Sequence, residues 1–221
     1  MKRRRLFWWP GWATIIAALA LVVVAIVAIR PAREPILRAA GWALVVNQEP
    51  VAPADIIVLT LDSGAAGALE AADLVQSGVA KRVAVFDEPP NREQKEFTRR
   101  GLPYEDAGAR QLRELKALGV TDVVHISKVY GTGDEGQALP PWSDEQHLQS
   151  MVVVAAKDHS RRLRRVLDRV MKGHATHAKV QAARYSDFDP DRWWKTRGGA
   201  RTEIIELQKL LLDCVRRPFQ S

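Results

Sequence analysis

Cysteine is nearly absent from this chain, because Cys214 is the only one among 221 residues. An intramolecular disulfide is therefore excluded. Internal repeats are also absent, and no low-complexity tract occurs beyond a proline- and alanine-rich connector near the amino terminus. Apolar residues make up 47% of the sequence, which is enough for a full core. The length suits one domain of ordinary size plus an anchor.

Acidic residues are missing from residues 1–30, and this explains most of the formal charge of +7. The five basic residues of that segment flank an apolar run. A second basic group lies within 157–172, which holds seven basic and two acidic side chains. The remainder of the chain is close to neutral or slightly acidic. A general nucleic-acid-binding surface is therefore not expected.

Residues 12–29 contain no charged side chain, and their 18 residues are just enough to cross a hydrocarbon core of about 30 Å. Four aromatic residues precede or begin the run, where an interfacial belt belongs, and a basic cluster lies before them. We expect residues 1–11 to be a cytoplasmic flank and 12–29 a single transmembrane anchor in the lipid bilayer of the plasma (inner) membrane. The main domain is then extracytoplasmic. A cleaved signal peptide is the alternative.

Apolar strands and amphipathic helices alternate after a connector over residues 30–51. The pattern predicts a three-layer, Rossmann-like α/β domain with a mostly parallel sheet over residues 52–216, followed by a tail at 217–221. The sequence predicts strands at 55–60, 82–86, 122–126 and 151–156, with a possible fifth at 179–184. Helices are expected at 64–77, 104–118, within 134–149 despite Pro140 and Pro141, at 160–172 and at 202–215.

Ionisable residues follow several of these strands, at the sheet edge where α/β proteins bind ligands. Histidine can exchange a proton near neutral pH, so His159 is a candidate general acid or base, with Glu135 orienting it and Asp62 opposite. Arg162 lies at the border of the apolar stripe of its helix and is a candidate for holding an anion. The further candidate anion-binding residues are Ser160, Thr132 and Ser63.

Each candidate has a structural alternative. His159 could merely cap its helix or bond a carbonyl, and Arg162 could pair with an acid such as Glu135. Arg161, Arg165 and Lys172 fall on the opposite side of the helix, where a solvated face is expected. The pair His174 and His177 lacks a third ligand nearby in the sequence. We assign no metal and no cofactor.

The segment Val154–Leu163 reads VAAKDHSRRL and resembles the strand–x–x–His–x–x–Arg signature of the YdcF/SanA/ElyC-like family (domain of unknown function 218). His159 and Arg162 match it, while Ala155-Ala156 replaces the Thr-Ser pair typical of the family. Residues 53–59 resemble the family's first strand, but Thr60-Leu61 replaces its glycines. The helix-opening segment 132–136 and the final helix with its glutamate, 206–209, are also similar.

The resemblance implies a cell-envelope protein connected with peptidoglycan assembly, barrier integrity or lipid-carrier metabolism. Our first hypothesis is a membrane-anchored domain that binds, and hydrolyses or transfers, an anionic small molecule or lipid-linked phosphate. The second is a non-catalytic envelope-integrity factor with a degenerate crevice, which the replaced hydroxyls and glycines favour. A third, a cytoplasmic nucleotide-binding domain, requires the reversed topology.

Overall fold

The computed structural model describes residues 14–17, 30–46, 51–126 and 129–216. The chain divides into two compact units, Met1–Ala40 and Gly41–Ser221. In the first unit residues 14–17 are helical, while the rest of the predicted anchor lies outside the described residues. Within the described ranges, no helix has the length and apolar character needed to cross a membrane.

Helix α2 (Arg30–Ala43) occupies most of the segment interpreted from the sequence as a connector. Pro31 lies in its first turn, where a backbone N–H has no intrahelical partner to lose. The second unit begins at Gly41, earlier than the predicted boundary at residue 52. The reason is that Leu44, Val45 and Val46 are buried and pack on the core of this unit.

The second unit contains a five-stranded parallel sheet with the strand order β3-β2-β1-β4-β5. The strands are β1 (Ile56–Leu59), β2 (Arg82–Phe86), β3 (Val123–Ile126), β4 (Ser150–Ala155) and β5 (His177–Ala182). All four residues of β1 are buried, as expected for a central strand with helices over both faces. The predicted α/β fold with a parallel sheet is confirmed, and the fifth strand is present.

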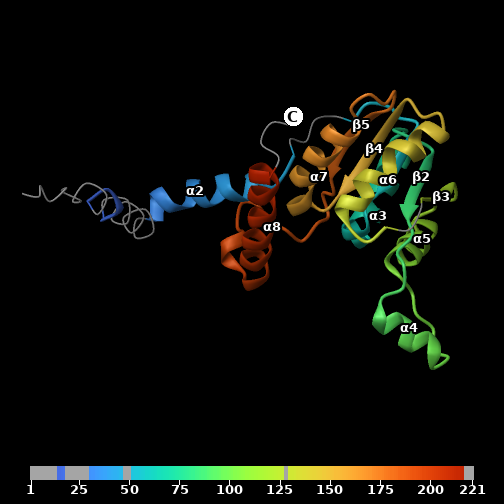
Figure 1. The fold of residues 1–221 in the computed structure, drawn as a ribbon, viewed down its shortest axis with the longest axis horizontal. Coiled ribbons are helices and arrows are strands. Elements are labelled where there is room, and N and C mark those ends of the chain that lie inside the picture. The colour runs from blue at the N-terminus through green and yellow to red at the C-terminus, as the bar shows by residue number, and fades with distance from the viewer. Residues whose placement is uncertain (1–13, 18–29, 47–50, 127–128, 217–221) are drawn as a thin grey trace, which may run out of the picture. The chain divides into compact units, whose positions relative to one another are not determined.

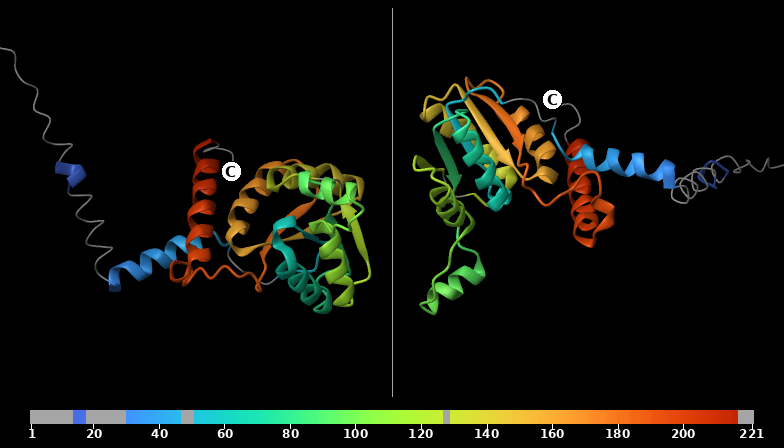
Figure 2. Two further views of the ribbon diagram at one scale, coloured as in Figure 1. Left: turned by 90° about the horizontal axis from the view of Figure 1, so that it is seen from below. Right: turned by 180° about the vertical axis from the view of Figure 1, so that it is seen from behind.

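Helices cover both faces of the sheet (Figures 1 and 2). On one face, α3 (Gly64–Gln76) and α5 (Ala107–Ala117) pack on a core that includes Ile57, Leu59 and Val85. On the other, α6 (Thr132–Glu145) and α7 (Lys157–Val170) pack on Val58, Phe86 and Val153. The closing helix α8 (Arg197–Arg216) packs against α7 and adds Leu210 to this second core.

Two local features differ from the sequence-based expectation. The polar segment after β2 contains a helix, α4 (Arg92–Arg99), which stands away from the sheet in Figure 1. A capping box explains its start, since Asn91 accepts from the Gln94 backbone N–H and the Gln94 side chain accepts from the Asn91 N–H. Helix α6 spans Thr132–Glu145, so it begins before the predicted range of 134–149, and it includes both Pro140 and Pro141.

Leu163→Ala tests the packing of α7 on the sheet. Leu163 is 0% exposed, whereas Leu211 on α8 is 55% exposed. We expect Leu163→Ala to lower the free energy of unfolding by about 2–5 kcal/mol, because the truncation leaves a cavity. Leu211→Ala, the matched control, should change it by less than about 0.5 kcal/mol. Urea unfolding measures both, and equal losses would contradict this assignment of the core.

Candidate functional site

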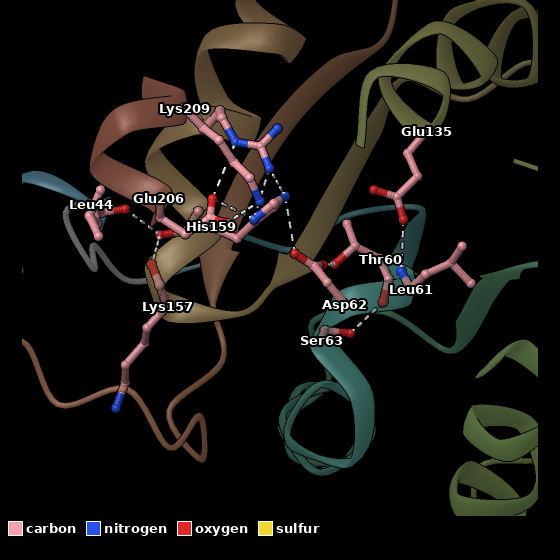
Figure 3. A network of polar contacts seen from close by, with 12 residues as sticks. Leu44, Thr60, Leu61, Asp62, Ser63, Glu135, Lys157, His159, Glu206 and Lys209 are labelled. Atoms are coloured by element: carbon pink, nitrogen blue, oxygen red, sulfur yellow. Dashed lines mark hydrogen bonds and ion pairs between the residues drawn. The ribbon is translucent and has the colours of Figure 1, made fainter. Parts of the chain in front are cut away.

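The candidate site lies at the carboxyl ends of β1 and β4, which are neighbours in the sheet. The order of strands along the chain reverses between these two, and such a reversal opens a crevice in doubly wound sheets. After β1 the chain forms a short 3-10 helix, η1 (Leu61–Ser63), and α3 follows at once. After β4 the chain enters α7 at Lys157. Asp62 and His159 meet across this junction (Figure 3).

His159 lies between two carboxylates. Its Nε2 is 3.1 Å from Asp62 Oδ2, and its Nδ1 is 3.3 Å from Glu206 Oε2. The residue is buried, with 7% of its surface exposed. Asp62 is itself fixed, because its Oδ1 accepts a hydrogen bond from Thr60 Oγ1 at 2.5 Å. The imidazole is thereby held at both ring nitrogens, so its plane and orientation are set by η1 and α8 together.

Arg162 lies over the face of this imidazole. Its Nη2 is 3.0 Å from Nδ1 and 2.7 Å from Nε2 of His159, and one atom cannot lie in line with both ring nitrogens. Its Nε is 3.4 Å from Glu206 Oε2. Arg162 therefore pairs with Glu206, not with Glu135 as the alternative interpretation of the sequence expected.

Glu206 contacts three nitrogen-bearing side chains. Besides His159 and Arg162, Lys209 Nζ donates to its Oε1 at 2.6 Å. Burial opposes ionisation of this carboxyl, but the hydrogen bonds from His159 and Lys209 and the charges of His159 and Arg162 outweigh it. The result is a pKa of about 2 for Glu206. This carboxylate stays ionised over the whole neutral range.

Glu135 does not have the predicted role of orienting His159. Its Oε1 accepts from the backbone N–H of Leu61 at 2.7 Å, and Figure 3 shows its carboxyl turned to that backbone. Burial, followed by the charge of Asp62, raises its pKa to about 7, although the Leu61 bond, His159 and Arg162 act the other way. Glu135 thus holds η1 in place, and Glu206 of α8 does the orienting.

The serines predicted to bind an anion use their hydroxyl protons inside the protein. Ser160 Oγ donates to Lys157 O at 2.8 Å and accepts from Val46 N, and Ser63 Oγ donates to Thr60 O at 2.7 Å. A hydroxyl has one proton to donate, so neither offers it to a ligand. The amide that follows Ser160 is also engaged, because Arg161 N donates to Leu44 O at 3.0 Å. Anion binding at Ser160 and Ser63 stays a prediction. Thr132 is the first residue of α6, and its side chain lies outside the described part of the chain.

The predicted solvated face of α7 is only partly correct. Arg161 donates to Val45 O at 2.6 Å, and Arg165 pairs with Asp213 of α8 at 3.0 Å. Lys172 is exposed, as expected. The difference arises because residues 44–46 and α8 cover this side of the helix. The sequence pattern of α7 alone does not indicate that these segments pack there.

A cleft of about 820 Å³ opens beside His159. Its walls come from the start of α3, the start of α7, the loop after β5 and the first half of α8. The ionisable residues lining it are Asp62, Asp158, His159, Tyr185, Asp187, Glu206 and Lys209. Lys209, and not Arg162, is the permanently cationic side chain among the lining residues. Carboxylates outnumber cations in the walls, which the sequence-based expectation of an anion site did not foresee.

In comparisons with protein-family models, with curated proteins and with solved structures, no match to this chain was found.

Glu206 and Lys209 are the functional residues to which the sequence reasoning assigned no role. Both belong to the segment 206–209, which resembles the last helix of the family. The resemblance did not indicate which side chains Glu206 and Lys209 contact, because the sequence does not show that α8 packs beside α7 at His159. The loop residues Tyr185 and Asp187, which line the cleft, had no signal of this kind.

Glu135→Gln tests the pH dependence of stability. The folded pKa of Glu135, about 7, lies above the ordinary value of 4.5, so the folded state holds its proton more tightly than the unfolded chain. Stability from this group is therefore greatest at acidic pH and falls as pH rises from about 4.5 to 7, by on the order of 3 kcal/mol. Glu135→Gln cannot ionise, and its unfolding free energy should fall less between pH 5 and pH 8.

The matched control is Glu145→Gln at the exposed end of α6. It should retain the wild-type slope of unfolding free energy against pH. If Glu135→Gln and the wild type lose stability in parallel over this range, the raised pKa is wrong.

Proposed function

We propose that this chain is a membrane-anchored cell-envelope protein whose α/β domain binds an anionic, phosphorylated precursor in the cleft. The precursor would then be hydrolysed, or its phosphoryl group transferred, and His159 would act as the proton donor or acceptor. The observation that supports this best is the placement of His159 between Asp62 and Glu206 at the wall of an open cleft. A histidine whose two ring nitrogens each face a carboxylate is held in one orientation, which proton transfer requires.

The start of α3 is the best place for the anionic group. Ser63 precedes this 13-residue helix with helical backbone angles, φ −68° and ψ −23°, and its side chain makes no cap hydrogen bond. Uncapped N–H groups and the helix dipole favour a negative charge at such an end. Ala65 and Ala66, in the first turn of α3, line the cleft. The start of α7 is less suitable, since Lys157 N already bonds Ser186 Oγ and His159 N bonds Ala156 O.

Cleavage of a phosphoester is the reaction that these groups fit. Water would attack phosphorus and give up its proton to Asp62, while the bond from phosphorus to the leaving oxygen breaks. The leaving oxygen would take its proton from His159, so that one alcohol and one phosphate are released. Glu206 would remain ionised and hold the imidazole, in keeping with its pKa of about 2.

A non-catalytic envelope factor is the second candidate, and a specific observation favours it. Arg162 and Lys209 both contact the same carboxylate, Glu206. Their charge is thus already partly compensated within the protein. In this case the cleft recognises a ligand or partner without turning it over.

A thermal-shift screen of the full chain separates these functions. The probes are inorganic phosphate, sugar phosphates, nucleotides and polyprenyl phosphates, each tested on the wild type and on Arg162→Ala. A ligand at 100 times its Kd stabilises the folded state by about 2.7 kcal/mol, or roughly 5–10 °C in Tm for a unit of this size. Arg162 does not line the cleft, so Arg162→Ala should lose this shift indirectly, by releasing His159 and Glu206, which do line it.

Arg164→Ala is the matched control, since Arg164 is on the same helix but pairs with Asp168 at the surface. It should keep the wild-type shift. Phosphate release from a ligand that binds, abolished by His159→Ala without loss of binding, would support the enzyme. Binding without release would favour the non-catalytic factor, and no shift with any phosphorylated probe would contradict the proposed ligand.

The topology of the anchor is tested by fusing reporters after Ser221. Residues 12–29 with the preceding basic cluster should place the carboxyl terminus outside the cytoplasm. Alkaline phosphatase fused there should be active, and a green fluorescent protein exported by the same route should be dark. The opposite pair of results would support the cytoplasmic nucleotide-binding domain instead.

A further inference from the structure

One of the carboxyl groups that line the cleft, that of Asp158, has no cationic partner within the part of the chain that the structure describes. Asp62 and Glu206 both contact His159, but Asp158, which also lines the cleft, pairs with no cationic side chain among the described residues. Burial raises the pKa of Asp158, the charge of His159 opposes this, and Glu206 and Asp62 raise it further. An acidic wall alone is a common surface feature. This acidic wall is distinguished by Glu203, a neighbouring residue on α8.

Glu203 is a buried carboxyl group without a hydrogen-bond partner. The residue is 1% exposed, and neither of its side-chain oxygens has a partner in the described part of the chain. Burial raises its pKa to about 7, and the charge of Asp158 adds to this effect. Buried polar groups in native proteins are nearly always bonded, so a carboxyl group with both oxygens unbonded indicates a missing partner.

Glu203 is not itself a lining residue, but it lies on the side of α8 that borders the cleft. Gly199 and Glu206 lie one helical turn before and after it on the same side of α8, and both line the cleft. Thr202, its neighbour in sequence, lines it as well. The charge of Asp158, at the start of α7, acts on Glu203 and adds to the rise of its pKa. Beside this wall, a Cβ added at Gly198 would meet nothing within 4 Å, so there is open space there.

The chemistry of the missing partner follows from the residues present. Within the described ranges, the carboxyl groups of Asp158 and Glu203 have no cation beside them, so ionising both is costly. A bound cation would lower that cost. A metal ion held by protein ligands needs several of them converging on one point. Among the described residues no three His, Cys, Asp or Glu side chains converge in that way. A cation bound by hydrogen bonds fits better, because an ammonium group has three donors that can reach separate acceptors.

We propose that Asp158 and Glu203 form a subsite for a primary ammonium group, so that the ligand of the cleft carries an amine as well as its anionic group. This deepens the proposed function and rests on its assignment of the cleft as the ligand site. The substrate class is thereby narrowed to a zwitterionic small molecule, with its phosphate at the start of α3 and its amine between α7 and α8.

The test compares probes that differ only in the amine, with the full chain in isothermal titration at pH 8. Phosphoethanolamine is paired with ethylene glycol monophosphate, and ethanolamine with ethylene glycol. At this pH the amines carry a charge and the Glu203 carboxyl, with its pKa of about 7, is mostly ionised. We expect each amine to bind the wild type at least about tenfold more tightly than its hydroxyl partner.

Glu203→Gln and Asp158→Asn should each reduce this preference to about one, while both variants still bind ethylene glycol monophosphate. Glu145→Gln is the exposed control and should keep the full preference. Retained affinity for the hydroxyl probe also shows that a variant is folded.

The outcomes separate this inference from the proposed function. Equal binding of both phosphate probes, unaffected by Glu203→Gln, would overturn the ammonium subsite and leave the phosphate site standing. A preference for both amines that Glu203→Gln removes, without any gain from the phosphate, would support the subsite and contradict the phosphorylated ligand. If no amine binds the wild type, the subsite is overturned.

Discussion

The parallel pairing of β1 with β4 brings together two segments that are far apart in the chain. Leu59 pairs with Val154, and the residues that follow each strand must then share one edge of the sheet. Because the strand order reverses between these two strands, no crossover connection covers the gap. Asp62 and His159 meet there without any contact that is local in sequence. The walls added by α8 and by the loop after β5 complete an arrangement that the sheet has already begun.

Within that arrangement, Glu206 balances the charges of the site. His159, Arg162 and Lys209 converge on this one buried carboxylate, and a buried cation without a counter-charge would be costly. Its presence explains why the crevice is not strongly basic despite the arginine-rich sequence of α7. It also explains why the cleft presents carboxylates to a ligand. The walls of the cleft thus combine carboxylates with one lysine.

The sequence predicted the fold well because buried parallel strands and amphipathic helices have strong local patterns. Asp62 and His159 were found for a related reason, since a residue that directly follows a central strand must lie at the ligand edge. Glu135 was given the wrong partner because position at that edge does not determine where a side chain points. Glu135 turned to the Leu61 backbone, and Ser160 to residues 44–46. The part played by Glu206 depends on how α8 packs, and that packing leaves no local pattern.

Residues 44–46 give the site a mechanical connection. Leu44 O accepts from the Arg161 backbone, Val45 O from the Arg161 side chain, and Val46 N donates to Ser160 Oγ. Ser160 and Arg161 are the two residues immediately after His159. The chain therefore enters this unit by fastening itself to the turn that carries the imidazole. A pulling force applied through residues 44–46 would act on the start of α7, which carries His159, before it acted on the sheet. The candidate site therefore lies where this domain would first take up such a force.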